Sequence, residues 1–384
     1  MTGPKNIAIL GSTGSIGCSA LDVVRSVDGL NVVGLSGHSQ IDLLAAQADE
    51  FQPDWVVGTD PVNSGSFPDC SQAPWGFHVG DKSLAKLVTD DNIDIVLAAI
   101  VGIAGLPSAW AAIDAGKTLA LANKETMVVA GQHLARRATE TGSQILPVDS
   151  EHSAIFQAMQ AGNANEVSRI ILTASGGPFR DFTTEQMKTA TVEQALNHPT
   201  WNMGKKNSID SATMMNKALE IIEARWLFDI PASQLEVVVH PQSIIHSIVE
   251  FTDGSSIAQL SPPDMKLPIQ YAFTWPDRVP GPSPKLDLSS AMTMELLPPD
   301  FERFPALKLG FEVAEAGGTA GAVMNAANES AVEAFLNNEI SFGDIATACR
   351  QIVEQHNFDP NPTLDDLFAA DHWARQEMSR WMFA

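Results

Sequence analysis

A glycine-rich turn near the N-terminus constrains the fold of this chain more than any other feature. The apolar run Ile7–Leu10 is followed by a glycine at every third position, Gly11, Gly14 and Gly17, and then by a helix-forming stretch. Glycines at this spacing permit a tight strand-to-helix turn and let backbone N–H groups approach a pyrophosphate at the helix N-terminus. The motif predicts a dinucleotide-binding fold, although a glycine turn without a ligand would give the same pattern.

The rest of the N-terminal region repeats this order of elements. Short apolar or β-branched segments alternate with helical ones, and the predicted strands are residues 6–10, 30–35, 55–57, 93–100, 118–122 and 144–148. Such alternation predicts a parallel sheet with helices on both faces. We therefore predict an α/β protein whose residues 1–148 form a Rossmann-like, doubly wound parallel sheet.

The remaining sequence divides into three regions. Residues 149–275 mix strands and helices, which predicts a central α+β domain, our candidate for the catalytic domain that holds metal and substrate. Residues 276–300 are rich in proline and lack periodicity, as is typical of a linker. Residues 301–384 have a helical pattern and predict a C-terminal helical domain.

The end of the second predicted strand bears on the choice of cofactor. NAD-binding proteins usually place Asp or Glu there to hold the ribose 2′-hydroxyl, but this chain has no carboxylate over residues 35–40. Because His38, Ser39 and backbone N–H groups could hold a 2′-phosphate instead, the sequence favours NADPH. The Tyr-x-x-x-Lys pair of short-chain dehydrogenases is excluded, because the only tyrosine is Tyr271 and residue 275 is Trp.

Two carboxylates follow the last strand of this region. Asp149 and Glu151 are two residues apart, so their side chains point to the same side if the chain is extended. Neighbouring carboxylates repel each other unless a cation or a proton lies between them, and ligands of open α/β sheets bind at strand ends. The pattern fits a metal site, but it equally fits Asp149 as the N-cap of a helix over residues 153–160, with Glu151 near the helix dipole.

A third carboxylate lies on a helix predicted over residues 211–228. An apolar stripe on that helix consists of Met215, Leu219, Ile222 and Trp226, and a neighbouring face carries Thr213, Asn216, Lys217 and Glu220. A carboxylate beside an amide and an ammonium suits an anionic substrate and a cation with hard oxygen ligands, Mg²⁺ or Mn²⁺ rather than zinc. The alternative is a surface ion pair between Lys217 and Glu220.

Two loops have the composition of a phosphate site. Ser175-Gly176-Gly177 follows a predicted strand over residues 168–173 and offers hydroxyl and N–H donors. Residues 198–206 combine Trp201, a glycine and two lysines, which is typical of a lid over a phosphorylated substrate; an ordinary loop with a buried Trp201 is the alternative. His240 and His246 lie in strand-like sequence, and we predict structural roles for them.

Composition excludes several classes of partner. The chain has 23 Lys plus Arg and 46 Asp plus Glu, a formal net charge of −23, so we expect binding neither to nucleic acid nor to an anionic membrane. Its three cysteines have no C-x-x-C spacing and predict neither a disulfide framework nor a thiolate metal site. The uncharged stretch 95–113 is interrupted by glycines and a proline, and the N-terminus lacks a signal-peptide pattern. We therefore expect a cytoplasmic protein.

Seven motifs together resemble the 1-deoxy-D-xylulose 5-phosphate reductoisomerase family of the non-mevalonate isoprenoid pathway. In family order across about residues 5–345 they are residues 11–17, 121–125, 147–152, 175–179, 198–204, 210–217 and 240–243. The resemblance implies an NADPH- and divalent-metal-dependent oxidoreductase that rearranges 1-deoxy-D-xylulose 5-phosphate and reduces it to 2-C-methyl-D-erythritol 4-phosphate. It also implies a homodimer.

The resemblance further implies roles for individual residues. The implied NADPH contacts are Thr13, Gly14, Ser15, Ile16, Gly37, His38, Ser39, Asn123, Glu125 and Gly204. The implied ligands of Mg²⁺ or Mn²⁺ are Asp149, Glu151 and Glu220. The implied substrate contacts are Lys124, Ser150 and Glu151 at the hydroxyl end, Ser175, His198, Ser211, Asn216 and Lys217 at the phosphate end, and Glu220. Of all these residues, the implied catalytic ones are Lys124, Asp149, Glu151, His198 and Glu220.

Two other functions share part of this pattern. One is a sugar-phosphate dehydrogenase that uses NADP without rearranging the carbon skeleton, which would convert the same substrate into an unbranched product. The other is an NADPH-sensing binding module whose carboxylates only cap helices, and it would tolerate neutral replacements of those carboxylates.

Overall fold

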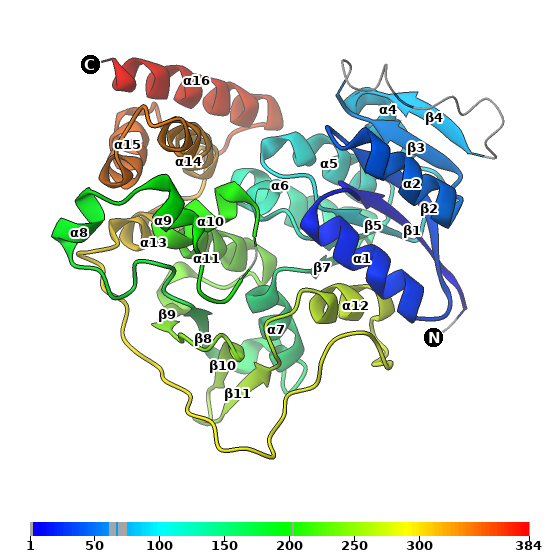
Figure 1. Cartoon of the computed structure of the whole chain (residues 1–384), viewed down its shortest axis with the longest axis horizontal. Coiled ribbons are helices and arrows are strands. Elements are labelled where there is room, and N and C mark those ends of the chain that lie inside the picture. The colour runs from blue at the N-terminus through cyan, green and yellow to red at the C-terminus, as the bar shows by residue number, and fades with distance from the viewer. Residues whose placement is uncertain (1–2, 61–66, 68–74, 202, 384) are drawn as a thin grey trace. The chain divides into compact units, whose positions relative to one another are not determined.

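The computed structural model describes residues 3–60, 67, 75–201 and 203–383, and its chain forms two compact units (Figure 1). Unit 1 consists of Met1–Thr126, Leu134–Ser153 and Asp264–Pro284. Unit 2 consists of Met127–His133, Ala154–Pro263 and Lys285–Ala384. The division at residues 148, 275 and 300 stays a prediction.

Unit 1 contains a seven-stranded sheet in which every pair of neighbouring strands is parallel, in the order β4-β3-β2-β1-β5-β6-β7. The strands are β1 (Lys5–Leu10), β2 (Leu30–Gly37), β3 (Trp55–Gly58), β4 (Gly76–Val79), β5 (Ile95–Ala98), β6 (Thr118–Leu121) and β7 (Ile145–Pro147). The strand order reverses between β1 and β5, where open α/β sheets bind their ligands. The predicted doubly wound parallel sheet is confirmed.

Helices connect these strands and cover the sheet. They are α1 (Ser15–Ser26), α2 (Ile41–Phe51), α4 (Asp81–Leu87), α5 (Leu106–Asp114) and α12 (Lys266–Thr274), with a short 3₁₀ turn, η1 (Ile103–Gly105). Crossovers between parallel strands are right-handed, so α1 and α5, which lead in opposite directions from the switch point, lie on opposite faces. Accordingly, α1 packs with α12, whereas α5 packs with α4. Helices α6 (Lys124–Thr141) and α7 (Ser150–Met159) contribute residues to both units.

The sequence pattern did not indicate β4 or α4. Strand β4 is a short edge strand, and three of its four residues are exposed. It therefore lacks the buried apolar run by which the other strands of this sheet could be recognised.

Unit 2 contains a mixed four-stranded sheet in the order β11-β10-β8-β9. Its strands are β8 (Val167–Ala174), β9 (Leu235–Val239), β10 (Ile245–Phe251) and β11 (Ser256–Leu260). The helices are α8 (Thr184–Lys188), α9 (Val192–Leu196), α10 (Lys205–Ala212), α11 (Met215–Leu227), α13 (Pro305–Ala316), α14 (Ala320–Leu336), α15 (Phe342–Gln355) and α16 (Leu364–Met382), with 3₁₀ turns η2 (Ala164–Glu166) and η3 (Ala232–Gln234). The expected α+β content and the C-terminal helices are present.

The prediction of one continuous helix over residues 211–228 was wrong. Helix α10 ends at Ala212 and α11 starts at Met215, because Met214 has a left-handed backbone with φ of 61°. The hydroxyl of Thr213 accepts the N–H of Met215, the first residue of the new helix, at 3.2 Å. Thr213 therefore belongs to the break and not to the helical face that the sequence predicted for it.

The proline-rich segment after α12 contains no helix or strand; its one ladder contact is an isolated bridge between Leu297 and Val239 of β9. Within the described residues, no helix combines the length and the apolar character that a membrane span requires. The uncharged stretch 95–113 folds as β5, the turn η1 and α5.

Candidate active site

Close backbone packing shapes the glycine loop between β1 and α1. Gly11 has φ of 82°, and a Cβ there would lie 2.7 Å from the carbonyl oxygen of Ala99, just beyond β5. A Cβ on Gly17 would lie 2.4 Å from the carbonyl oxygen of Gly11. Both contacts are to backbone, so neither position accepts a side chain. Gly14, in contrast, is exposed, and a Cβ there would meet only the Gly11 carbonyl oxygen at 3.4 Å.

The open side of this loop is the start of α1. Gly14 is the N-cap residue, and Ser15 and Ile16 form the first helical turn, whose N–H groups have no partner within the helix. Thr13 is buried beneath the turn. The exposed N–H groups and the positive end of the helix dipole make this position suitable for a pyrophosphate.

Three side chains that the sequence analysis did not identify hold the loop in place. The Ser36 hydroxyl accepts the Gly11 N–H at 3.0 Å. The Gln47 amide donates to the Ser12 carbonyl oxygen at 3.0 Å, and the Gln40 amide donates to that of Thr13 at 3.0 Å. Ser36 was recognisable only as a polar residue near the end of β2, whereas Gln40 and Gln47 gave no separate signal.

Replacing the two glycines by alanine therefore has different expected results. Gly17→Ala should lose the native loop, and with it most of the thermal stability and NADPH binding, because its Cβ would overlap backbone atoms. Gly14→Ala should keep the wild-type melting temperature within a few degrees but weaken NADPH binding by about tenfold or more, because its Cβ would face the pyrophosphate. Calorimetry and equilibrium titration with NADPH measure both effects. Equal behaviour of the two variants would contradict this account of the loop.

The residues expected to hold the 2′-phosphate lie at the end of β2. Gly37 is buried as the last residue of β2, and His38 and Ser39 follow it with exposed side chains. The His38 Nδ1 atom lies 3.0 Å from the Thr59 hydroxyl, which orients the ring. An imidazole and a hydroxyl are thus exposed beside the loop, and no carboxylate occupies the end of the strand.

Asn123 is the N-cap residue of α6, Lys124 and Glu125 are in its first turn, and all three are buried. The Asn123 side chain caps α6 by accepting the Thr126 N–H at 2.9 Å, and its amide donates to the carbonyl oxygens of Ile100 and Gly102. Asn123 thus ties the segment after β5 to the start of α6. The Lys124 ammonium forms an ion pair with Asp149, a contact that neither local pattern indicated.

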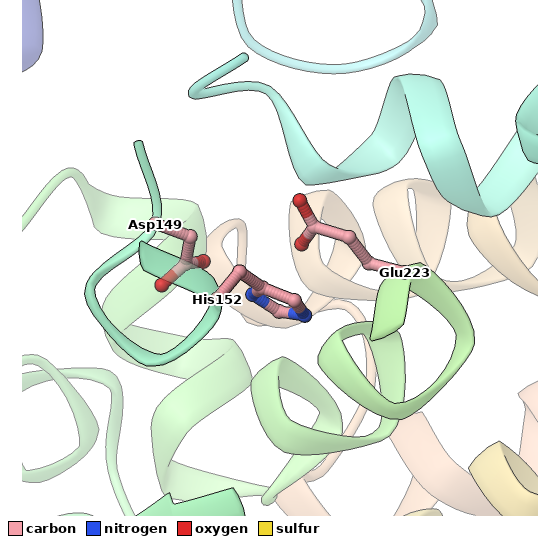
Figure 2. A group of neighbouring side chains, drawn as sticks. All are labelled: Asp149, His152 and Glu223. Atoms are coloured by element: carbon pink, nitrogen blue, oxygen red, sulfur yellow. The ribbon is translucent and has the colours of Figure 1, made fainter. Parts of the chain in front are cut away.

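Asp149 and Glu151 lie where β7 meets α7, but not in an extended chain. Helix α7 begins at Ser150, so Asp149 precedes the helix and Glu151 is in its first turn; the expected extended i, i+2 geometry was wrong. The two carboxylates nevertheless place oxygens within 4.8 Å of each other. The Ser150 hydroxyl donates to Glu151. Figure 2 shows Asp149 with His152, whose ring nitrogen also lies within 4.8 Å of it, and draws Glu223 of α11.

In unit 2, the predicted phosphate loop contacts the predicted lid. His198 Nε2 lies 3.0 Å from the Ser175 hydroxyl oxygen, which also accepts the Gly177 N–H at 3.2 Å. His198 Nδ1 accepts the N–H groups of Thr200 and Trp201 at 3.1 and 2.9 Å. An Nδ1 atom that accepts two hydrogen bonds carries no proton, so the neutral ring is protonated on Nε2 and donates to Ser175. The Ser175 hydroxyl hydrogen can then be donated to a ligand.

Burial lowers the pKa of His198 below its usual 6.5. As the pH falls below about 6.5, this histidine is therefore protonated in the unfolded chain before it is protonated in the folded chain. The stability that neutral His198 contributes is fully present above about pH 6.5, and it is lost as the pH falls through the lowered pKa. Between pH 6.5 and 5, the wild type should lose more unfolding free energy than His198→Gln does. Denaturant titrations across this pH range measure the unfolding free energy of both proteins. Equal losses in the wild type and in the variant would contradict the lowered pKa of His198.

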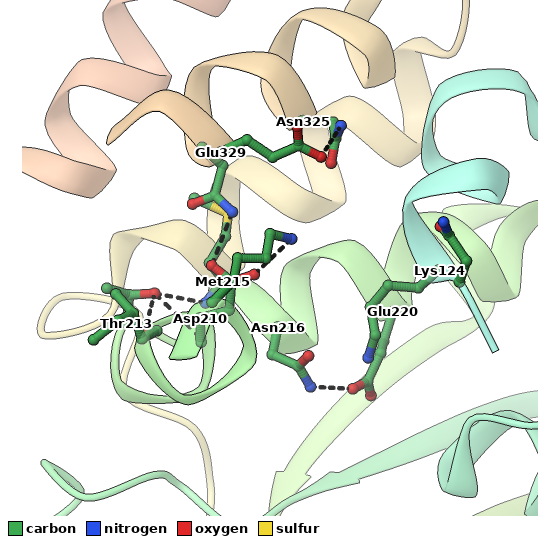
Figure 3. A network of polar contacts seen from close by, with 12 residues as sticks. Lys124, Asp210, Thr213, Met215, Asn216, Glu220, Asn325 and Glu329 are labelled. Carbon is green, nitrogen blue, oxygen red and sulfur yellow. Dashed lines mark hydrogen bonds and ion pairs between the residues drawn. The ribbon is translucent and has the colours of Figure 1, made fainter. Parts of the chain in front are cut away.

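The break between α10 and α11 lies against the glycine turn of the predicted phosphate loop, Ser175-Gly176-Gly177. Gly177 has φ of 66°, and a Cβ there would lie 2.4 Å from the Ser211 carbonyl oxygen, so the loop and the end of α10 are in backbone contact. In the first two turns of α11, the Asn216 amide and the Lys217 ammonium both donate to Glu220, as Figure 3 shows for Asn216. Lys217 and Glu220 are almost fully buried, which excludes the alternative of a surface pair.

The remaining candidates occupy ordinary structural positions. Gly204 is the N-cap residue of α10 and is exposed. His240 Nδ1 lies 2.8 Å from the Glu295 carbonyl oxygen, and His246 Nε2 lies 3.1 Å from that of Ser261. These contacts agree with the structural roles expected of the two histidines. The Trp201 ring is half-buried, and its centroid lies 6.3 Å from that of His246.

Unit 1 presents a dinucleotide loop, and unit 2 presents clustered donors for an anion, so the chain belongs to the class of dinucleotide-dependent enzymes that act on anionic substrates. Residues 7–131 match the family 1-deoxy-D-xylulose 5-phosphate reductoisomerase, and residues 145–228 and 260–377 match two C-terminal domains of that enzyme. The chain belongs to the 1-deoxy-D-xylulose 5-phosphate reductoisomerase family, as its motifs suggested.

Individual relatives agree with this membership. The chain is 50% identical to the 1-deoxy-D-xylulose 5-phosphate reductoisomerase of Rhodopirellula baltica, across 97% of this chain and 93% of that protein. It is 51% identical to that of Chlorobium chlorochromatii, across 97% and 98%. Among solved structures, it resembles the Zymomonas mobilis enzyme in complex with NADPH, with a TM-score of 0.92, 43% identity and 99% coverage of both chains. It also resembles a DOX-P reductoisomerase in complex with NADPH, fosmidomycin and magnesium, with a TM-score of 0.93, 40% identity and 98% coverage of both chains.

Proposed function

We propose that this protein converts 1-deoxy-D-xylulose 5-phosphate into 2-C-methyl-D-erythritol 4-phosphate, with NADPH and a divalent cation, in the biosynthesis of isoprenoid precursors. The observation that carries this proposal is the 50% identity to relatives of that activity over 97% of the chain. The chain is thus an NADPH-dependent oxidoreductase. Solved complexes of DOX-P reductoisomerase that name a metal name magnesium, and we propose that Mn²⁺ can replace it because both cations take hard oxygen ligands.

The glycine loop of this chain fits NADPH. Its open N–H groups lie at the start of α1, and Gly14 has no Cβ that would keep a pyrophosphate away. We propose that Thr13, Gly14, Ser15 and Ile16 hold the pyrophosphate and that Gly37, His38 and Ser39 hold the 2′-phosphate. We further assign Asn123, Glu125 and Gly204 to the rest of the cofactor.

The carboxylates fit a hard divalent cation. Asp149 and Glu151 place oxygens within 4.8 Å of each other, and like charges this close favour a cation between them. We propose that these two residues and Glu220 are the metal ligands. When bound, the cation would polarise the substrate carbonyl as a Lewis acid, and NADPH would supply the hydride.

We propose that the chain's own donors hold the two ends of the substrate. Ser175, Ser211, Asn216 and Lys217 would hold the phosphate directly, and His198 would act through Ser175, whose hydroxyl hydrogen it leaves available. Lys124, Ser150 and Glu151 would orient the hydroxyl groups at the reacting end. Binding energy from the phosphate would then close the segment around Trp201 and exclude water while the carbon skeleton rearranges.

The structure of the product tests this proposal. We expect NMR of the product to show the branched carbon skeleton of 2-C-methyl-D-erythritol 4-phosphate. An unbranched product would favour a sugar-phosphate dehydrogenase without rearrangement. If the substrate were consumed in neither way while NADPH still bound, the chain would be an NADPH-sensing module, and the proposed function would be wrong.

We further propose the organisation that the motifs suggest. Residues 1–148 would bind NADPH, and residues 149–275 would bind metal and substrate. Residues 276–300 would form a linker to the C-terminal helical domain, residues 301–384. We propose a homodimer, which light scattering of the purified protein would test. We propose a cytoplasmic location, because the described cysteines, Cys18 and Cys349, are both free, as is usual in a reducing compartment.

A further inference from the structure

The break between α10 and α11 separates two groups of proposed phosphate donors. Ser211 is in the last turn of α10, whereas Asn216 and Lys217 are in the first turn of α11. The distance between these groups therefore depends on how the two helices are joined. A left-handed conformation such as that of Met214 is unfavourable for an L-residue. Surrounding contacts must hold the break in this shape.

Asp210 provides such a contact, although it cannot touch a ligand itself. Asp210 immediately precedes Ser211 in the sequence, and its side chain has no exposed surface. One carboxylate oxygen accepts a hydrogen bond of 2.8 Å from the Asn328 amide, and the other lies 2.9 Å from the Lys206 ammonium. A buried carboxylate is costly unless its partners are well placed, and removing one partner of a buried pair is strongly destabilising. The last turn of α10 is thus fixed by Lys206 in the first turn of the same helix and by Asn328, which lies outside the proposed site.

Asn328 brings the C-terminal helices into this arrangement. It has no exposed surface and belongs to α14. The next residue, Glu329, accepts hydrogen bonds from Asn325 at 3.0 Å and from Arg375 of α16 at 2.6 Å, and Arg375 also pairs with Asp371 (Figure 3 shows Asn325, Glu329 and Asp210). Helix α14 is therefore tied to α16 through Glu329 and to α10 through Asn328.

We infer that Asp210 and Asn328 are positioning residues for substrate binding: their buried hydrogen bond lets the C-terminal helices fix the α10–α11 break, and with it the distance between Ser211 and the first turn of α11. The inference rests on the proposed function for the nature of the anion, the phosphate group of the substrate. Neither residue touches that group; both act through Ser211, Asn216 and Lys217.

A reversal of the pair tests this role. Asn328→Asp places two carboxylates against each other, Asn328→Ala removes the donor, and the double variant Asp210→Asn with Asn328→Asp restores one hydrogen bond in the opposite direction. We expect each single variant to weaken the binding of inorganic phosphate about tenfold and to raise KM similarly, with kcat within about threefold. The double variant should recover wild-type phosphate affinity to within about twofold.

The matched control is Asp371→Asn, which weakens the ion pair between buried Asp371 and half-buried Arg375 within α16 without touching α10. At a comparable loss of melting temperature, this control should leave phosphate affinity and KM within about twofold of wild type. The inference is overturned if Asn328→Ala binds phosphate like the wild type, if the control weakens phosphate binding as much, or if the double variant regains stability without regaining phosphate affinity. If Asn328→Asp fails to fold, Asn328→Ala and the double variant still test the positioning role.

The two proposals fail in different ways. A wild-type protein that does not convert 1-deoxy-D-xylulose 5-phosphate but binds phosphate with the expected variant pattern contradicts the proposed function alone. A wild-type protein that converts the substrate while all variants keep its KM contradicts only the positioning role.

Discussion

Replacing Glu220 by Gln is expected to lower kcat by about 10³-fold while NADPH affinity changes less than twofold. The substitution keeps the shape of the side chain but removes a negative charge that we assign to the metal. It also places an amide against two donors, because Asn216 and Lys217 both donate to this carboxylate. NADPH should still bind, because its proposed loop lies in unit 1. Steady-state turnover and a fluorescence titration with NADPH measure the two effects.

The chain contains a matched control for this variant. Glu329 accepts a hydrogen bond from Asn325 four residues earlier on α14, as Glu220 does from Asn216 on α11 (Figure 3). Glu329 too has a cationic partner, Arg375. Glu329→Gln should leave kcat within about twofold of wild type, because this carboxylate has no assigned role in chemistry. Near-normal turnover in Glu220→Gln, Asp149→Asn and Glu151→Gln would reject the proposed metal site.

Replacing Lys217 by Met is expected to reduce kcat/KM by about 10²–10³-fold, mainly through KM. The ammonium is nearly fully buried on the first turn of α11, next to Glu220. Methionine has a similar volume, so the change chiefly removes the charge that we assign to the substrate phosphate. Arginine is expected to restore little, because a planar guanidinium does not fit the space of a buried ammonium.

Lys188→Met is the control for removing a cation from unit 2. Lys188 pairs with Glu185 at 2.9 Å on the exposed surface of α8, where ion pairs contribute little. Its kinetic constants should equal those of the wild type within error. If Lys217→Met kept a wild-type KM, Lys217 would not bind the phosphate, and the assignment of Asn216 in the same helical turn would be in doubt.

The sequence contained enough information to predict the nucleotide-binding sheet and its loop. Local sequence patterns predict both: glycines at every third position, apolar segments of strand length, and residues 36–40 without a carboxylate at the end of the second strand. Gly11 and Gly17 illustrate the reason, because their backbones lie so close to other backbone that no other residue fits. The motifs of the family then supplied the candidate residues without any knowledge of their contacts.

What the sequence did not predict depends on contacts between distant residues. Nothing about Met214 indicates a left-handed backbone, so the spacing of polar residues suggested one helix where there are two. Asp149 pairs with Lys124, and Asp210 pairs with a residue 118 positions later, and neither partner is visible in a local pattern. Edge strand β4 was missed because three of its four residues are exposed and it carries no periodic burial signal.

The most direct test of the central claim is NADPH oxidation by the purified protein with 1-deoxy-D-xylulose 5-phosphate. It should be measured with Mg²⁺, with Mn²⁺ and with a chelator, and with NADH in parallel. We expect oxidation that requires the divalent cation, stops with the chelator, and is clearly faster with NADPH than with NADH. Equal rates with NADH would contradict the assignment of His38 and Ser39 to the 2′-phosphate. No oxidation under any of these conditions would contradict the proposed function itself.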